Sequence, residues 1–143
     1  MAGLPNPAAF AELNIRSMLA AADKGDIEKF ISYWAPDGKN YFTGKETSME
    51  DMKKRIAAFK AGFPDIKRTL DKVVVSGNIV TLRGWVTGTN TGMFRGQPGT
   101  GNAIKLYWLG FYELNEQGKI KAGYVEFDTA TLESQLKGTV ASK

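Results

Sequence analysis

Three residues that could carry out acid–base chemistry alternate near the C-terminal end of the chain. Tyr124, Glu126 and Asp128 stand two residues apart in a segment that reads as a strand, and side chains two apart along a strand point to the same face. In apolar surroundings, one member of a pair of carboxylates has a raised pKa. Such a carboxyl suits proton abstraction beside a carbonyl group, with a Tyr or Asn nearby to stabilise the enolate oxygen.

Asp128 and Asn90 each have a structural alternative to a role in catalysis. Asp128 directly precedes residues 129–136, a predicted short helix, and Asp is among the residues that best cap a helix N-terminus. Asn90 comes before a Gly-rich segment, and Asn tolerates the left-handed backbone of turns as well as offering hydrogen bonds to a substrate. Glu126 stands near a strand end, where a carboxylate is usually solvated. We retain Asp128 and Asn90 as candidate catalytic residues and Glu126 as a candidate substrate-binding residue.

The 143-residue chain contains neither His nor Cys. Their absence excludes Ser-His-Asp and Cys-His catalysis and Cys-ligated zinc, and it removes the commonest ligand of other transition metals. Acid–base work therefore falls to carboxylates, Tyr or Lys, and we expect neither a metal nor a cofactor.

Five aromatic residues are candidates for lining a substrate pocket. They are Tyr33, Trp34, Tyr41, Trp108 and Tyr124. Aromatic side chains at these spacings more often belong to an ordinary core, so both interpretations stay open. A hollow space between helices and a sheet would bring some of them to its wall.

The formal net charge of +4 does not indicate nucleic-acid binding, because the basic residues are scattered along the chain. The densest basic run, Lys53-Lys54-Arg55, falls within a predicted amphipathic helix, and we interpret it as a solvated helix face. No stretch reaches the roughly eighteen apolar residues of a membrane span, and the first residues lack the layout of a secretory signal peptide. We expect a soluble, cytoplasmic protein with no nucleic-acid or membrane partner.

Apolar residues at helical spacing predict three helices in the N-terminal half. They cover residues 7–24, 26–34 and 49–63, with a short extended piece at residues 40–42 between the last two. Gly25 supplies a stop after the first helix, and Pro36-Asp37-Gly38 ends the second with turn chemistry. The sequence before the third helix resembles a capping box.

The content of β-branched and aromatic residues rises after Pro64 and predicts four strands. They cover residues 66–76, 79–90, 103–114 and 119–128. Short connections make these strands an antiparallel meander, and the preceding helices can cover only one of its faces. In residues 79–90 the even positions are apolar or small, so we place them on the helix-covered face. The expected fold is a single α+β domain over residues 1–143, with N-terminal helices packed on a curved, mainly antiparallel sheet.

The strand predicted at residues 103–114 carries large apolar side chains on both faces. Leu106 and Trp108 lie on one face, and Tyr107, Leu109 and Phe111 lie on the other. The helices can cover only one of these faces, so the outer one needs a different cover. We expect a homodimer that forms through the outer surface of the sheet.

Several short pieces of the C-terminal half occur together in one known family. They are FPDI at residues 63–66, GTNTGMFRGQPGTG at 88–101, GKI at 118–120 and FDTATLESQL at 127–136. On these pieces the chain resembles the SnoaL-like polyketide cyclase and ester cyclase family, within the nuclear-transport-factor-two-like superfamily. The segment GDIEKFISYWAPDG at residues 25–38 is similar to the second helix of that family and the turn after it.

The resemblance implies a cone-shaped, cystatin-like fold whose pocket holds a small apolar carbonyl compound. It also implies that an Asp late in the last long strand acts as acid and base, and by position this residue is Asp128. Asn90 stands where the family often carries His, and Ala122 and Tyr124 stand where it often shows Glu and Trp. Asn can donate a hydrogen bond but cannot shuttle a proton at neutral pH.

Two functions follow as expectations. The first is a cyclase or isomerase step without a cofactor, in which Asp128 moves a proton and Asn90 or a pocket Tyr polarises the carbonyl group. The alternative is a non-catalytic protein of the same fold that binds a small ligand or acts as a scaffold. Both functions predict an apolar cavity of roughly 300–1,000 Å³ between the helices and the sheet.

Overall fold

The computed structural model describes residue 3 and residues 6–138, and the first helix in it is α1 (Pro7–Lys24). The Asn6 side chain accepts a hydrogen bond from the Ala9 backbone N–H at 3.1 Å and so caps the helix. Proline at the first helical position is tolerated, because the N–H that it lacks would have no partner inside the helix. Gly25 ends the helix in the left-handed conformation, with φ 73°. The predicted bounds of this helix are confirmed.

The second predicted helix is shorter than expected, because strand pairing takes over its last residues. Helix α2 covers Ile27–Ser32, and strand β1 covers Trp34–Phe42. The backbone N–H of Ile120 donates a hydrogen bond to the carbonyl oxygen of Tyr33 at 2.9 Å, which draws this segment to the sheet. Trp34, expected on the helix, therefore begins a strand, although it stays buried.

Helix α3 (Met49–Gly62) forms where the capping pattern predicts it. The Ser48 hydroxyl accepts a hydrogen bond from the Asp51 backbone N–H at 3.0 Å. The short strand β2 (Lys45–Thr47) precedes the helix and pairs with β1 in an antiparallel hairpin.

The remaining strands confirm the predicted antiparallel meander. They are β3 (Lys67–Ser76), β4 (Ile79–Thr89), β5 (Ala103–Leu114) and β6 (Ile120–Phe127). The six described strands form one sheet in the order β2-β1-β6-β5-β4-β3, and β1 runs parallel to β6. The sequence did not predict this parallel edge of the sheet.

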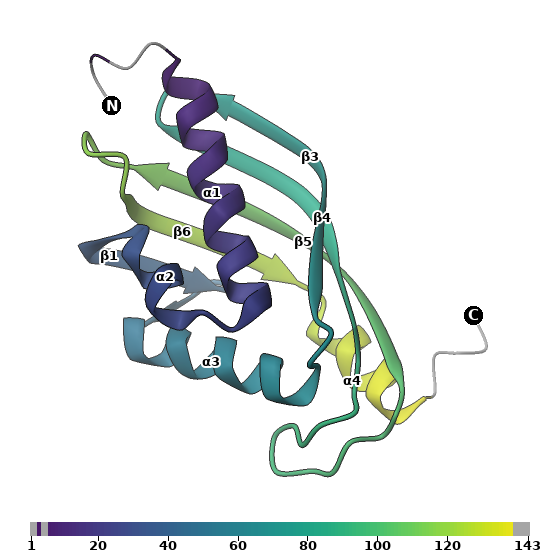
Figure 1. Ribbon diagram of the computed structural model, residues 1–143. Helices are drawn as coiled ribbons and strands as arrows, with labels where there is room; N and C mark the ends of the chain where they lie inside the picture. Colours follow the sequence, from purple (N-terminus) through teal and green to yellow (C-terminus); the bar gives the residue numbers. More distant parts are fainter. Residues whose placement is uncertain (1–2, 4–5, 139–143) are drawn as a thin grey trace.

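The curved sheet wraps around α1, α2 and α3, while α4 (Thr129–Lys137) follows β6 at one end of the sheet (Figure 1). Along β4 the even positions Val80, Leu82 and Gly84 are buried, which confirms the face predicted for them. The main core forms where this concave face meets α1 and α3. None of the described helices has the length and apolar character needed to cross a membrane.

Candidate functional site

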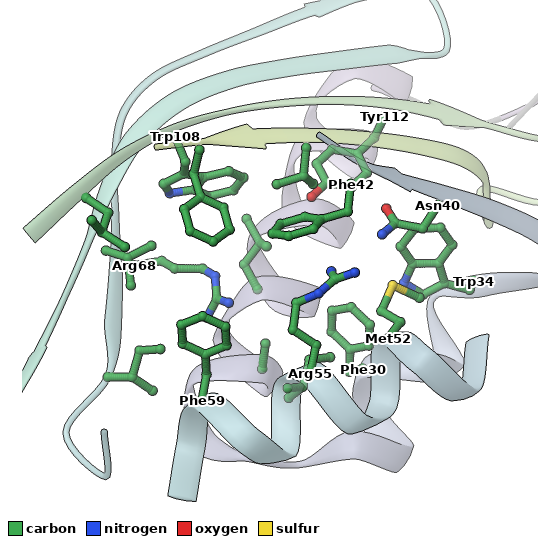
Figure 2. Close-up of a pocket in the computed structure, with 18 residues that line it drawn as sticks. Phe30, Trp34, Asn40, Phe42, Met52, Arg55, Phe59, Arg68, Trp108 and Tyr112 are labelled. Atoms are coloured by element: carbon green, nitrogen blue, oxygen red, sulfur yellow. The ribbon is translucent and has the colours of Figure 1, made fainter. Parts of the chain in front are cut away.

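A cavity opens between the concave face of the sheet and helices α1, α2 and α3, and aromatic side chains form much of its wall. The rings come from three strands and two helices: Phe30, Trp34, Phe42, Phe59, Trp108, Tyr112 and Phe127 (Figure 2). Its volume is about 90 Å³, which is smaller than the sequence-based expectation. The difference arises because the side chains of Phe42 and Arg55 project into the cone and fill part of it (Figure 2).

Arg68 on β3 brings a positive charge to the cavity wall, and Asp23 of α1 balances it. The Arg68 guanidinium forms an ion pair with the Asp23 carboxylate, and the Arg68 backbone N–H donates to the same carboxylate at 2.9 Å. Both side chains are about one-fifth exposed, at 21% and 18%. The pair joins the end of α1 to β3, so it both fixes the cavity wall and neutralises its charge.

Arg55 on α3 brings a second positive charge, and no carboxylate is in contact with it. Among the described residues its guanidinium has no hydrogen bond and no ion pair, and its Cζ lies 3.8 Å from the centroid of the Phe42 ring. Burial lowers the pKa of Arg55, while the negative charge of Asp51 one turn earlier opposes the shift. An arginine remains protonated at neutral pH despite such a shift.

Tyr112 on β5 contributes a protonated hydroxyl group to the same cavity. Its side chain is buried, and desolvation raises its pKa to about 12, although the charges of Arg68 and Arg55 lower it. The hydroxyl is therefore neutral across the physiological range and can donate a hydrogen bond. Figure 2 shows the Tyr112 hydroxyl and the Arg55 guanidinium directed into the same space.

The two tryptophans of the wall each carry a buried donor without a partner. The indole Nε1 atoms of Trp34 and Trp108 are the buried side-chain polar atoms that lack a hydrogen bond among the described residues. The Asn40 amide donates to the Thr47 hydroxyl at 3.3 Å. The described residues that line the cavity include no carboxylate, so its polar groups are mainly hydrogen-bond donors.

The structure brings only two of the predicted pocket aromatics to the cavity. Trp34 and Trp108 line it. Tyr33 instead packs at the edge of the main core. Tyr41 and Tyr124 lie on the outer face of the sheet, where their rings stack with centroids 4.9 Å apart. The outer position follows from strand alternation, because the neighbours of these two tyrosines in sequence are the residues that face inward.

Tyr124 and Glu126 share one face of β6, as predicted, but that face is the outer one, and Asp128 lies beyond the end of the strand. Val125 and Phe127, which alternate with them on β6, line the cavity. The inward face of β6 is set by these apolar side chains, because burying them is more favourable than burying carboxylates. The structure therefore corrects the predicted position of Glu126, which is exposed.

Asp128 is a helix cap, which is the structural alternative to catalysis that the sequence also predicts. Its carboxylate caps α4, accepting hydrogen bonds from the backbone N–H of Thr131 at 2.9 Å and from the Thr131 hydroxyl. These bonds lower the pKa of Asp128 from its ordinary value. Asp128 is exposed and does not line the cavity. The predicted raised pKa in an apolar pocket is therefore wrong for Asp128.

Asn90 is buried, but its side chain is used by the loop that follows β4. Its amide N–H groups donate to the carbonyl oxygens of Gly62 at 3.1 Å and Gly92 at 3.0 Å. Its amide oxygen accepts from the backbone N–H and the hydroxyl of Thr100, both at 3.0 Å. These four bonds use the full capacity of the side chain, and Asn90 is not among the residues that line the cavity.

Arg55 and Tyr112 are the functional candidates that sequence reasoning missed. The interpretation of Lys53-Lys54-Arg55 as a solvated helix face is wrong for Arg55, because the Arg55 side chain points into the cavity. The signal was present in the spacing of α3. Arg55 falls between Met52 and Phe59 in an otherwise apolar stripe at i, i+3 and i+7. A cationic side chain inside an otherwise apolar helix stripe indicates that this side chain lies in the wall of a pocket.

Comparison with solved structures identifies several proteins that share this fold. AclR from Streptomyces galilaeus, for which a hydroxylase activity has been suggested, is 25% identical with a TM-score of 0.83, covering 91% of this chain and 82% of AclR. IdmH from Streptomyces antibioticus, for which a polyketide cyclase activity has been suggested, is 24% identical with a TM-score of 0.77, covering 89% of this chain and 98% of IdmH.

A further structure shares the fold at lower identity. It is a protein from Jannaschia sp. CCS1, suggested to be a SnoaL-like polyketide cyclase, at 15% identity and a TM-score of 0.81, covering 96% of this chain and 98% of that one. A comparison with curated protein sequences found no significant match. The sequence model of SnoaL-like polyketide cyclases matches residues 12–136, which is most of the chain. The protein therefore belongs to the SnoaL-like polyketide cyclase family, and it has the nuclear-transport-factor-two-like fold that its sequence predicted.

Proposed function

We propose that the protein binds a small, ring-containing carbonyl compound in the cavity and polarises the carbonyl oxygen through Arg55 and Tyr112. The observation that carries this proposal is the contrast between an aromatic wall and a set of hydrogen-bond donors directed into it. Aromatic side chains favour a planar or cyclic ligand. Donors in surroundings of low polarity stabilise the negative charge that develops on a carbonyl oxygen.

A titration with acetophenone, a one-ring ketone suited to the small cavity, tests this proposal. The chain has three tryptophans, of which Trp34 and Trp108 line the cavity while Trp85 contacts Tyr107 on the other face of the sheet. We expect the indole N–H signals of Trp34 and Trp108 to shift in NMR spectra and the Trp85 signal to stay in place. If all three signals stay in place, or if only Trp85 responds, the cavity does not bind such a compound.

A cyclase or isomerase step is the second candidate function, and membership of the SnoaL-like family favours it. Such a step needs a base, and the sequence-based candidate is Asp128. Asp128 directly follows Phe127 in sequence, and the Phe127 ring lines the cavity. Its use as a helix cap opposes this role.

A carboxyl titration of Asp128 by NMR separates the two roles. Because Thr131 donates to the ionised carboxylate, we expect Asp128 to titrate below the ordinary pKa of 3.8. Its stabilising effect is then present above the unfolded pKa of about 3.9 and is lost as the pH falls through the folded value. Asp128→Asn, which keeps a capping oxygen, should abolish the titration without changing acetophenone binding. A pKa above the ordinary value would instead support Asp128 as the acid–base group.

We also propose that the protein forms a homodimer through the outer face of the sheet. Large apolar side chains are exposed there: Val74, Tyr107, Leu109, Phe111 and Tyr124. A patch of this kind on a soluble protein is typical of an interface. The curved outer face of a second copy would cover it, because a two-fold interface pairs the same surface on both subunits.

Leu109→Lys tests the dimer, because Leu109 is 55% exposed on β5 and a charge there would need to be desolvated in the interface. We expect dimeric wild-type protein and monomeric Leu109→Lys protein in sedimentation experiments at micromolar concentration. Leu13→Lys is the matched control, because Leu13 is 61% exposed but lies on α1 and not on the outer face of the sheet. This substitution should leave the dimer intact. A monomeric wild-type protein would contradict the proposal.

A further inference from the structure

The cavity carries one positive charge that forms no ion pair with any residue in the described part of the chain. Of the two arginines at its wall, Arg68 is paired with Asp23. Arg55 has no ion pair among the described residues, and its neighbour Asp51 acts on it only through space. Desolvating an unpaired charge is unfavourable, so a cation kept at this position indicates a ligand that supplies the missing negative charge.

The surroundings of Arg55 hold its guanidinium in an orientation that leaves N–H groups free. The Phe42 ring lies against the guanidinium, with the Arg55 Cζ 3.8 Å from the ring centroid. This cation–π contact occupies a face of the planar group. The N–H donors lie around the edge of that plane, where a carboxylate can accept two parallel hydrogen bonds.

The other polar groups of the cavity also favour a ligand that accepts hydrogen bonds. The Tyr112 hydroxyl is protonated at neutral pH, and the indole N–H groups of Trp34 and Trp108 lack partners within the described chain. The exception is the carbonyl oxygen of the Asn40 amide, which is an acceptor. No carboxylate among the described lining residues would repel an anion.

We infer that the physiological ligand is an aromatic or cyclic carboxylic acid, bound as its anion with the carboxylate on Arg55. This inference rests on the proposed function, because it names the class of compound that the same cavity takes. It goes beyond that function by assigning a net charge to the ligand and a charge-recognising role to Arg55.

Three ligands of almost identical shape separate this inference from the function on which it rests. Acetophenone, benzamide and benzoate share one ring and one carbonyl carbon and differ only in the third substituent, which is methyl, amino or an anionic oxygen. Their affinities are measured from the indole N–H shifts of Trp34 and Trp108, with Trp85 as the internal control. We expect benzoate to bind at least about tenfold more tightly than benzamide, as a charge-assisted hydrogen bond predicts.

Arg55→Met removes the charge while keeping a long apolar side chain in the apolar stripe of α3. We expect this variant to bind benzoate no more tightly than benzamide. It should lose more of its affinity for benzoate than for acetophenone, because only benzoate carries the charge that Arg55 balances. Lys54→Met is the matched control, because Lys54 is exposed on the same helix and its loss lowers the net charge equally. It should keep the full preference for benzoate.

The possible failures have different meanings. Equal affinities for benzoate and benzamide in the wild-type protein, with acetophenone bound, would overturn the inference and leave the proposed function in place. A preference for benzoate that survives in Arg55→Met would overturn the role of Arg55. If none of the three compounds shifts the Trp34 and Trp108 signals, both the inference and the proposed function are wrong.

Discussion

Asn90→Ala is expected to lower the free energy of unfolding by about 2–4 kcal/mol, because it removes the four hydrogen bonds of a buried side chain. The Asn90 side chain is 2% exposed and makes four hydrogen bonds. These bonds join the end of α3 to both sides of the loop between β4 and β5. Without them the carbonyl oxygen of Gly62 and the backbone N–H of Thr100 lose their side-chain partner.

Chemical denaturation measures this loss, and Asn115→Ala is the control. The Asn115 side chain accepts bonds from the backbone N–H groups of Gln117 and Lys119 in a turn near the surface, where water can replace it. We expect the control to cost about 1 kcal/mol or less. An Asn90→Ala protein as stable as the control would show that the loop does not depend on this side chain, and it would reopen the sequence-based role of Asn90 in the site.

Asp23→Asn is expected to lower the free energy of unfolding by about 1–3 kcal/mol, since it leaves the partly buried charge of Arg68 without its partner. The amide oxygen of Asn can still accept the bond from the Arg68 backbone N–H, so the loss reports the missing charge. The cavity should also become more positive. Benzoate should therefore bind more tightly to this variant than to the wild-type protein, while acetophenone binding should change little.

Glu12→Gln is the matched control, because it makes the same change on the same helix at an exposed ion pair. Glu12 pairs with Arg16 at 2.8 Å, and the two side chains are 38% and 47% exposed. Such a pair contributes at most about 1 kcal/mol. If Asp23→Asn costs no more than Glu12→Gln, the Asp23–Arg68 pair does not hold the cavity wall in the way described.

Most of the fold could be predicted from the sequence, because its signals are local. Helices α1 and α3 have both an apolar stripe and a cap, and short turns join β3 to β4 and β5 to β6. Strand β1 could not be predicted in full. It contains Pro36 and Gly38 and bulges between Trp34 and Lys39, and its parallel partner β6 lies about eighty residues later in the chain. When a strand pairs with a segment far away in the sequence, its own residues contain little information about that pairing.

The candidate site was predicted less well, because its position depends on which face of a strand turns inward. The sequence shows correctly that Tyr124 and Glu126 share a face, but alternation alone does not say which face is buried. The apolar neighbours Val125 and Phe127 line the cavity, so the face that they share is the buried one. For Asp128 the choice between a pocket and a cap also depends on the exact end of β6, and element ends are the hardest feature to predict.

If the cavity polarises the carbonyl oxygen of a bound ring compound, as proposed, the carbonyl carbon of the ligand reports this directly. Acetophenone labelled with ¹³C at the carbonyl position can be followed by NMR as it binds to the protein. Hydrogen bonds from Arg55 and Tyr112 draw electron density toward the oxygen, so we expect the bound carbonyl signal to move downfield of its position in water. The downfield shift should diminish in Arg55→Met and in Tyr112→Phe. A bound signal that moves upfield, toward its position in an apolar solvent, would contradict the account.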